Sequence, residues 1–571
     1  MELTCGQVLA KCLKKEGVTY VFGVPGGQLF PFIEAVSREE GMKVITTRHE
    51  ENAAHMADAV SRLTGTIGVC FGTTGPGATN MLPGVAAAYA DSIPLLAITP
   101  NNQTFCTYPF IGSLQDGDHK SLYSSITKWN AVIQDWNRIP ELIHTAFRIA
   151  LSGRPGPVHL DIPADIMFKK GEIDVLPEPE SYRAYGRVRA DHSLAQKAFE
   201  MVLNANRPLL LAGGGVVRSE AWEVFYQLAK ETGIPATTTP MGAGCLPADD
   251  EAFFGASGWL GGDAVMKALR EADVVLAIGC RFSTWVGYGR PPVMGGPQQK
   301  IIHVDIQSER IGQNPEIALG IVSDAKTFLQ DILAMVKEEK KKSFKMDSNW
   351  PKSLIAAYKA YIGKAEEIAN TPSTPMNQAT LAKEVAQFMD KDAIVSFDGG
   401  QAMEWSNTFV RIRHPRQKLF TPGMGHLGFG QPFANAAKLC FPDRQVINMA
   451  GDGGFGCTLQ ELETAVRYNL PVINVISDDR AWGMIKGGQA ALYGHPVGVD
   501  LSDANYAEIA KGFGAYGERL TDPVEIKPAL RRAAASGKPA VLDVITQTTG
   551  HLVDQYWVIL VLNQCELPMP R

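Results

Sequence analysis

The sequence has no excess of positive charge and no long apolar run. It carries 54 Lys and Arg against 60 Asp and Glu, a net charge of −6, so it lacks the basic surface that nucleic acid or an anionic membrane would attract. No stretch reaches the ~18 consecutive apolar residues of a membrane-spanning helix, and no basic segment followed by an apolar one opens the chain. We therefore expect a soluble, cytoplasmic protein with no nucleic-acid or membrane partner.

Cysteine is scarce and shows no metal or redox pattern. The nine cysteines form no CxxC pair and no His/Cys cluster at zinc-ligand spacing, and several stand inside apolar stretches. This distribution predicts buried thiols in a reducing compartment. Charged residues make up only 20% of the chain, below the ~25% usual for soluble domains, which favours extensive cores and subunit contacts. We expect a homo-oligomer.

Short apolar runs alternate with helical periodicity through most of the 571 residues. Such an alternation predicts an α/β protein with mainly parallel sheets, here three consecutive doubly wound domains. We expect them at 1–175, 190–345 and 370–571, with a proline- and charge-rich linker over 174–189. The apolar tail over 554–562 either packs on the last domain or covers a site as a lid. Strands are expected at 18–24, 44–46, 67–70, 95–98, 158–162, 208–212, 274–278, 300–304, 393–397, 446–449 and 472–476.

The strongest chemical signal is a glycine-rich turn that contains an acid. Gly451, Gly453 and Gly454 surround Asp452 directly after an expected strand, and the next strand ends near Asp479. The separation, 479 − 452 = 27 residues, is the length of one βαβ step. A glycine-rich turn lets backbone amides approach a phosphate, and Mg²⁺ prefers carboxylate and phosphate oxygens. A Gly-Asp-Gly surface turn is the alternative, but it does not account for the second acidic strand end.

This spacing resembles the diphosphate signature of thiamine-diphosphate (ThDP) enzymes. The family usually has Asn where this chain has Asp479, which keeps an oxygen for the metal and adds a charge. The resemblance implies Mg²⁺ held by Asp452, Asp479 and the backbone carbonyl of Ala481.

The segment around Glu50, from Arg48 to Asp58, resembles the part of the family that binds the aminopyrimidine ring of ThDP. The resemblance implies that Glu50 is the catalytic acid that assists formation of the ThDP ylid. The alternative for Glu50 is an exposed acid at the start of a helix.

Further motifs resemble the acetohydroxyacid (acetolactate) synthases over nearly the whole chain, among them residues 23–27, 74–80, 91–94, 114–116, 126–128 and 428–432. The resemblance implies that Leu427 holds ThDP bent and that Gln115 and Lys128 border the substrate pocket. His426 is either a pocket acid or base or a packing residue. The other residues expected to bind the cofactor are Gly26, Gly27, Gly400, Gln401, Gly483 and Met484.

The central domain resembles the part of the synthases that holds FAD, although Ser283 and Thr284 replace the usual acidic pair. FAD, an ADP-like nucleotide and an empty cleft all stay open. The residues that would bind FAD are Gly213, Gly214, Arg281, Asp305 and Asp324.

One departure concerns the substrate. A Trp shapes the acceptor pocket in the synthases, whereas this chain has Gly487 and Gly488 there. The expected reaction is therefore ThDP-dependent decarboxylation of a 2-oxo acid and carboligation, without assuming the branched-chain substrates.

Three alternatives to this function were considered. A relative with another donor or acceptor would resemble sulfoacetaldehyde acetyltransferase or cyclohexane-1,2-dione hydrolase. A catalytically silent homologue is disfavoured because Glu50, Asp452 and Asp479 are all present. A nicotinamide dehydrogenase is disfavoured because no strand-borne G-x-G-x-x-G is followed by an acid.

Overall fold

The computed structural model describes residues 2–173, 175–338 and 344–557. They form two compact units that interleave along the chain. The first comprises 1–186, 421–444 and 457–472, and the second comprises 187–420, 445–456 and 473–571. The end of the expected apolar tail, residues 558–562, and Cys565 lie outside the described residues.

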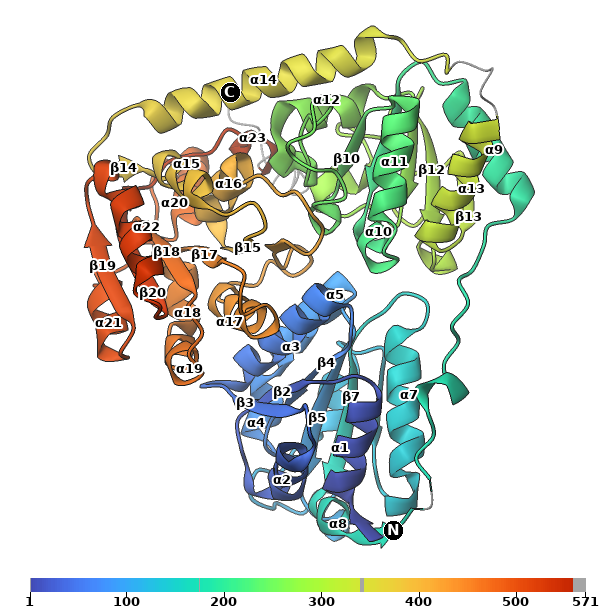
Figure 1. Ribbon diagram of the computed structural model, residues 1–571, viewed down its shortest axis with the longest axis vertical. Helices are drawn as coiled ribbons and strands as arrows, with labels where there is room; N and C mark the ends of the chain where they lie inside the picture. The colour runs from blue at the N-terminus through green and yellow to red at the C-terminus, as the bar shows by residue number, and fades with distance from the viewer. Residues whose placement is uncertain (1, 174, 339–343, 558–571) are drawn as a thin grey trace. The chain divides into compact units, whose positions relative to one another are not determined.

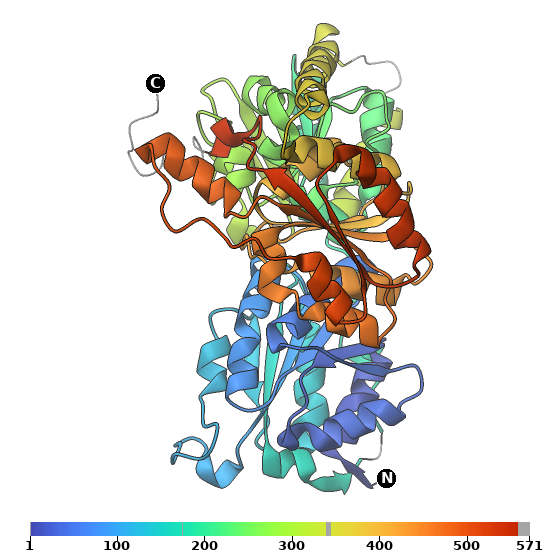
Figure 2. The ribbon, with the colours of Figure 1, turned by 90° about the vertical axis from the view of Figure 1, so that its left-hand side faces the viewer.

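A parallel six-stranded sheet in the order β3-β2-β4-β5-β7-β6 forms the centre of the first unit (Figures 1 and 2). Its strands are β2 (Tyr20–Gly23), β3 (Lys43–Thr46), β4 (Gly68–Phe71), β5 (Leu95–Asn101), β6 (Trp129–Val132) and β7 (Val158–Pro163). The helices of this unit are α1 (Cys5–Lys15), α2 (Phe30–Arg38), α3 (Glu50–Thr64), α4 (Pro76–Asn80), α5 (Leu82–Asp91), α6 (His119–Tyr123), α7 (Ile139–Leu151), α8 (Ala164–Phe168), α17 (Gly430–Cys440) and α19 (Glu461–Arg467). A short antiparallel pair, β1 (Glu2–Thr4) and β8 (Lys170–Glu172), joins the two ends of its first segment.

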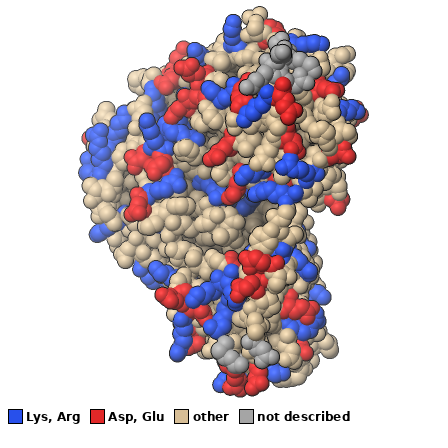
Figure 3. Space-filling model, turned by 45° about the vertical axis from the view of Figure 1, so that its right-hand side comes forward, with Lys and Arg blue, Asp and Glu red and all other residues tan. Residues whose placement is uncertain are grey.

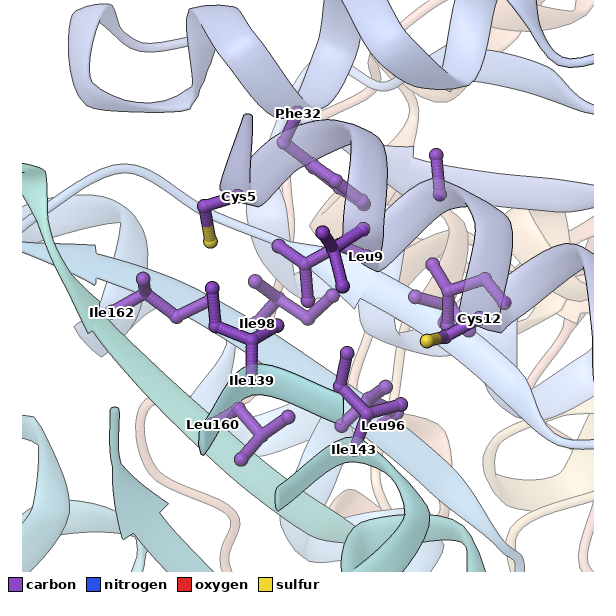
Figure 4. Packing of buried hydrophobic residues seen from close by; sticks show 14 of the residues in the cluster. Cys5, Leu9, Cys12, Phe32, Leu96, Ile98, Ile139, Ile143, Leu160 and Ile162 are labelled. Atoms are coloured by element: carbon purple, nitrogen blue, oxygen red, sulfur yellow. The ribbon is translucent and has the colours of Figure 1, made fainter. Parts of the chain in front are cut away.

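Helix α1 shows why these residues form a core. Thr4 caps the helix in a capping box with Gln7, and the apolar face that follows is buried. In Figure 4, Leu9 lies among aliphatic side chains of the sheet such as Ile98. Cys12 is also buried, and burial raises the pKa of its thiol to about 12. The prediction of buried thiols is confirmed for most of the described cysteines, since among them only Cys457 is exposed.

Helices α3 and α17 pack against each other, so the segment 421–444 joins the first unit although it is distant in sequence. A buried ion-pair network supports this contact. Arg62 pairs with Asp58 at 2.6 Å and with Asp91 at 2.8 Å, and Asp91 also accepts a hydrogen bond from the amide of Gly423. The guanidinium lies over the ring of Phe433, at 5.4 Å from its centroid. Charge pairing and an aromatic contact together bind α17 to α3.

The second unit contains two parallel sheets. The smaller has the order β10-β9-β11-β12-β13, with β9 (Pro208–Ala212), β10 (Ala236–Thr238), β11 (Val274–Ile278), β12 (Lys300–Asp305) and β13 (Leu319–Val322). Its helices are α9 (His192–Leu203), α10 (Gly214–Arg218), α11 (Trp222–Thr232), α12 (Gly262–Glu271) and α13 (Ala325–Glu338). Helix α14 (Asn349–Asn370) follows and packs against both α12 and α15.

The larger sheet has seven strands in the order β14-β20-β18-β17-β15-β16, with β19 also pairing with β20. The strands are β14 (Met376–Asn377), β15 (Ile394–Asp398), β16 (Lys418–Leu419), β17 (Val446–Gly451), β18 (Ile473–Asp478), β19 (Tyr516–Leu520) and β20 (Ala540–Gln547). The helices are α15 (Gln378–Phe388), α16 (Gly400–Phe409), α18 (Asp452–Thr458), α20 (Gly483–Tyr493), α21 (Tyr506–Gly512), α22 (Ile526–Ala535) and α23 (Asp554–Trp557). The predicted α/β class with doubly wound, mainly parallel sheets is confirmed.

Acidic and basic side chains are interspersed over the face shown in Figure 3. Within the described ranges, we find no helix with both the length and the apolar character that crossing a membrane requires.

The described part of the C-terminal tail packs on α16. The imidazole of His551 lies 3.0 Å from the hydroxyl of Thr408, and Tyr556 donates a hydrogen bond to Asp263. Asp554 approaches Glu404, whose side chain is fully buried. Burial, followed by the neighbouring Asp554, raises the pKa of Glu404 well above its usual value. The contact between tail and helix therefore brings two carboxyl groups with raised pKa values together.

We predict that Glu404→Gln flattens the pH dependence of stability. An acid with a raised pKa in the folded state keeps a proton that the unfolded chain releases above pH ~4.3, so the free energy of unfolding falls as pH rises toward the folded-state pKa. Glutamine removes that titration, and the variant should exceed the parent in melting temperature at pH 8 but not at pH 5. Thermal melts at both pH values measure this, with the exposed Glu309→Gln as control. Parallel melting curves for Glu404→Gln and the parent would contradict the prediction.

Candidate active site

The carboxyl ends of β15, β17 and β18 lie side by side at one edge of the larger sheet. Helices α16, α18 and α20 begin at or shortly after these strand ends, so several helix N-termini gather at the same edge. The N-terminus of a helix offers unpaired backbone amides and a partial positive charge. This edge of a parallel sheet is where open α/β folds bind phosphorylated ligands.

Asp452 and Asp479 meet at this edge. Asp452 is 1% exposed, and within the described chain its Oδ2 atom has no hydrogen-bond partner. Burial, followed by the charges of Asp479 and Asp478, raises the pKa of Asp452 to about 8. Asp479 accepts a 2.9 Å hydrogen bond from the hydroxyl of Thr548, yet burial raises its pKa too. The oxygen donors and their mutual repulsion suit a divalent cation.

A second pair of acids lies behind this pair. Burial, followed by Asp478, raises the pKa of Asp543 to about 7. The guanidinium of Arg519 lies 3.7 Å from Asp478 and 3.6 Å from Asp543, and it also pairs with the exposed Asp503. The strand ends therefore concentrate more negative charge than the neighbouring arginine neutralises.

Three glycines are required by close contacts at this edge. A Cβ atom on Gly453 would lie 2.6 Å from the ring of Trp482, and one on Gly454 would lie 3.1 Å from Asp398. A Cβ on Gly483 would clash with the carboxylate of Asp479. The glycine-rich turn therefore lets the loop before α20 approach the acidic pair.

The other residues predicted at the diphosphate lie at the starts of α16 and α20. Gly400 has a positive φ of 49°, which favours glycine, and it begins α16. Gln401 is 5% exposed, and its Oε1 has no hydrogen-bond partner among the described residues. A Cβ atom on Gly400 would lie 3.7 Å from the Cβ of Met484, so these two residues are neighbours. Ala481 forms an isolated antiparallel β-bridge with Asp500. The two backbone hydrogen bonds of this β-bridge do not involve the carbonyl of Ala481.

Glu50 is the first residue of α3 in the first unit. Its Oε2 accepts a 3.0 Å hydrogen bond from the side-chain amide of Asn80, and the residue is 7% exposed. A Cβ on Gly77 would lie 3.0 Å from Oε1, so α4 approaches the carboxylate closely. Asn80 is a contact that sequence reasoning missed. It stands in the 74–80 motif, but nothing in the motif says which side chain Asn80 meets.

A buried histidine holds the turn that precedes α4. The Nε2 atom of His119 accepts a 3.0 Å hydrogen bond from the amide of Gly75, and its Nδ1 lies 2.9 Å from Asp161. The backbone of Gln115, which has a positive φ of 62°, lies against Gly75. The structure thus brings Gln115 to the turn next to the Glu50 segment, and it adds His119 and Asp161, which the sequence analysis did not identify.

Lys128 lies at the C-terminal end of α7. Its Nζ donates hydrogen bonds of 2.6 and 2.7 Å to the carbonyls of Ile149 and Ser152. Burial, followed by the charge of Arg154, lowers its pKa to about 8. These are helix-capping contacts, and the role of Lys128 toward a substrate stays a prediction.

Gly26 and Gly27 precede α2. A Cβ on Gly26 would clash with Thr73, whereas one on Gly27 would meet open space. Gly26 therefore permits close packing, and Gly27 leaves room beside it.

His426 and Leu427 stand in the loop before α17, and both are partly buried. The Nε2 atom of His426 lies 3.3 Å from Glu51, and its ring centroid lies 5.0 Å from that of His55. No local pattern in the sequence indicates these contacts with α3.

Three family models match the chain. They are described as the N-terminal TPP binding domain, the central domain and the C-terminal TPP binding domain of thiamine pyrophosphate enzymes, and they cover residues 3–120, 195–332 and 398–544. The chain is a member of the thiamine-diphosphate enzymes. It is 38% identical to the probable acetolactate synthase large subunit of Methanocaldococcus jannaschii over 94% of this chain and 91% of that protein.

Two further relatives are also acetolactate synthase large subunits. The acetolactate synthase large subunit of Haemophilus influenzae is 31% identical, over 96% of both chains. That of Lactococcus lactis is 30% identical, over 96% of this chain and 93% of that protein. The protein is thus a ThDP-dependent carboligase of the acetolactate synthase type, and the resemblance inferred from its motifs is confirmed.

In the central domain of this ThDP enzyme, close packing accounts for Gly213 and Gly214. A Cβ on Gly213 would clash with the backbone of Gly279, and one on Gly214 would lie 2.9 Å from Met241. The predicted FAD ligands have protein partners: Asp305 accepts a hydrogen bond from the amide of Gln307. Asp324 accepts hydrogen bonds from the hydroxyl of Ser219 and from Arg187. Arg281 stands beside Phe282, which has a positive φ of 52°.

We predict that Asp479→Asn stabilises the metal-free enzyme at alkaline pH. The folded-state pKa values of Asp452 and Asp479 are raised, so both acids cost stability as pH rises above the unfolded value of ~3.9 toward pH 8. Asparagine removes one charge and keeps the oxygen that accepts from Thr548. Each kcal/mol gained should raise the melting temperature by roughly 2–4 °C.

Thermal melts in EDTA at pH 5 and pH 8 measure the effect, with Asp390→Asn as an exposed acidic control. A loss of stability in Asp479→Asn at pH 8 would mean that the acidic pair does not repel.

Proposed function

We propose that this enzyme uses ThDP and Mg²⁺ to decarboxylate a 2-oxo acid such as pyruvate and to join the remaining acyl group to a second carbonyl compound. With pyruvate in both roles, two pyruvate anions and one proton give one acetolactate anion and one CO₂. Bound ThDP supplies the carbon that attacks the donor carbonyl and accepts the electron pair released with CO₂. Membership of the acetolactate synthase type supports this substrate class.

The observation that carries the proposal is the buried acidic pair at the strand ends. Asp452 has an unpaired carboxylate oxygen in the described structure, a pKa raised to about 8 and a neighbouring acid in Asp479. This donor set fits Mg²⁺, with Asp452, Asp479 and the carbonyl of Ala481 as its protein ligands. A diphosphate on the same ion would accept hydrogen bonds from the amides near Gly400 and Gly453.

Glu50 would position the proton on the aminopyrimidine ring. Asn80 holds one carboxylate oxygen at 3.0 Å, which leaves the other oxygen to accept from a ring nitrogen. The close approach of Gly77 and the His119 contact to Gly75 support the rigidity of this arrangement. We also propose that Leu427 holds the bent cofactor and that Gln115 borders the substrate.

We further propose that the enzyme is a homodimer or homotetramer of the cytoplasm. In the family that the motifs resemble, the Glu50 region of one subunit faces the Asp452 region of another. An active site shared between two subunits would leave the isolated chain inactive. Pairing two chains about a C2 axis would give two equal active sites.

The first test of the function is the activity of Glu50→Gln. The wild-type enzyme should release CO₂ from pyruvate and form acetolactate, which mass spectrometry detects. Glutamine retains hydrogen bonding but cannot act as the carboxylate partner, so exchange of the thiazolium C2 proton should slow by roughly 10²–10⁴-fold while ThDP still binds. NMR follows the exchange, with Glu40→Gln, at an exposed acid of the same unit, as control. Exchange at the wild-type rate in Glu50→Gln would refute the assignment.

We propose that the central domain holds flavin loosely or not at all. Its glycines are explained by backbone packing, and Asp305 and Asp324 already have partners within the protein. In addition, Trp285, next to Ser283 and Thr284, stacks on Trp259 with ring centroids 4.8 Å apart. We predict substoichiometric flavin absorbance in freshly purified enzyme. One tightly bound flavin per chain would show that these residues do not prevent binding.

The acceptor pocket should be wide. Gly487 and Gly488 lie in the middle of α20, where the synthases carry a Trp by resemblance, and an indole buries roughly 150–250 Å². The loss of such a contact could remove a preference of roughly 10–200-fold. We predict no strong preference for 2-oxobutyrate over pyruvate in the native enzyme, and a regained preference in Gly488→Trp. Competition between both oxo acids measures this, and a native preference of about tenfold or more would contradict it.

A further inference from the structure

A cluster of two histidines and one glutamate lies in the first unit, on the side of α3 that Glu50 does not use. Glu51 and His55 are separated by four residues on α3, so their side chains share one face of the helix. His426, from the loop before α17, completes the cluster. One ligand atom from each of these residues lies within 4.8 Å of the other two.

His55 has no hydrogen-bond partner for either ring nitrogen within the described chain, although its side chain is fully buried. Its Nε2 is 3.6 Å from Oε1 of Glu51, which is longer than a hydrogen bond. Its ring lies edge-on to those of His426 and Phe433, at centroid distances of 5.0 and 5.8 Å. An unpaired imidazole in this environment costs free energy unless another ligand satisfies it.

We propose that Glu51, His55 and His426 form a binding site for a divalent transition metal of the zinc class, separate from the oxygen-lined Asp452 pair. Imidazole nitrogens and one carboxylate are a donor set that binds Zn²⁺ and leaves a fourth position for water or another ligand.

The distances fit this assignment. Metal–ligand bonds of about 2.0–2.2 Å in a tetrahedral site place the ligand atoms about 3.3–3.6 Å apart. Oε1 of Glu51 lies 3.3 Å from Nε2 of His426 and 3.6 Å from Nε2 of His55. The third separation, between the ligating nitrogens of His55 and His426, is at most 4.8 Å, so binding a metal requires the two imidazoles to turn toward a shared point. A carboxylate and a histidine four residues apart on a helix is also the spacing that lets one helix face supply two ligands.

The charge states support metal binding. Burial, followed by the proximity of His55, lowers the pKa of His426, so its imidazole is neutral at neutral pH. Burial would raise the pKa of Glu51, but its interactions with His55, His426 and His49 outweigh burial and lower it. A neutral imidazole and an ionised carboxylate are the forms that coordinate a metal.

The two histidines also differ in access. His55 has no exposed surface, whereas the side chains of His426 and Glu51 are 21% and 20% exposed. A metal can therefore enter from the side of His426, with His55 as the buried ligand. His49, whose Nδ1 lies 4.0 Å from Glu51 and accepts the Glu51 amide hydrogen, supports the orientation of that carboxylate.

Cobalt titration of the full-length, EDTA-treated enzyme in excess Mg²⁺ tests the proposal. Four-coordinate Co²⁺ with nitrogen ligands absorbs visible light far more strongly than six-coordinate Co²⁺ bound by oxygen, so the signal separates this site from the Asp452 pair. We expect one equivalent of strongly absorbing Co²⁺ per chain, displaced by Zn²⁺ but not by Mg²⁺. His426→Ala should abolish the band and weaken Zn²⁺ binding by about 100-fold or more. His495→Ala, at an exposed histidine, should keep it.

The absence of a strong band in the wild-type enzyme, or its retention in His426→Ala, would overturn the proposal. The wild-type titration is decisive even if the variant fails to fold. A failure here leaves the ThDP function untouched, because that function is tested by product formation and not by cobalt absorbance.

Discussion

Mutual repulsion of buried carboxylates is the constraint around which the larger sheet of the second unit is arranged. Parallel strands β17 and β18 carry acids to the same edge, and burial denies Asp452 the solvent that would screen its charge. Such a cluster is unfavourable in an apo protein. A cation and a polyanion would relieve this repulsion. The glycines let α20 come close to the acids, helix N-termini lie at the strand ends, and Arg519 pairs with the acids behind.

Helix α3 gives the first unit two neighbouring acids that face different partners. Glu50 contacts Asn80 from α4, whereas Glu51 contacts His426 from the loop before α17. Arg62 lies over Phe433 of α17, and Asp91 accepts from the Gly423 amide, so the packing of α17 against α3 supports the contact of Glu51 with His426. The first residue serves the ThDP chemistry that we propose, and the second belongs to the proposed metal site.

The central strands and the acidic turn could be predicted from the sequence because their signals are local. An apolar run followed by Gly-Asp-Gly predicts a buried strand and its carboxyl end. The 27-residue step from Asp452 to Asp479 predicts the neighbouring strand. Short strands such as β6 and β10 were missed because a few half-polar or small residues carry little periodicity. The eight-residue strand β20, inside the larger sheet, was also missed, since Asp543 interrupts its apolar run.

Contacts between distant segments could not be predicted. Nothing local in the sequence says that His119 accepts the Gly75 amide or that His426 meets Glu51. The amine of Lys128 illustrates the same limit, because a motif resemblance places it near a substrate while the fold gives it the carbonyls at the end of α7. Motifs identify residue types at a site, and tertiary packing decides which atoms they meet.

The central claim is that the Asp452 pair holds a divalent cation that ThDP requires for binding. Calorimetric titration of the metal-free enzyme with ThDP, in Mg²⁺ and in EDTA, tests it most directly, with Asp452→Ala measured alongside. The account predicts tight binding only in Mg²⁺ and an affinity for ThDP that falls by roughly 100-fold, about 3 kcal/mol, in the variant. Equal affinity with and without Mg²⁺, or an unchanged affinity in Asp452→Ala, would contradict it.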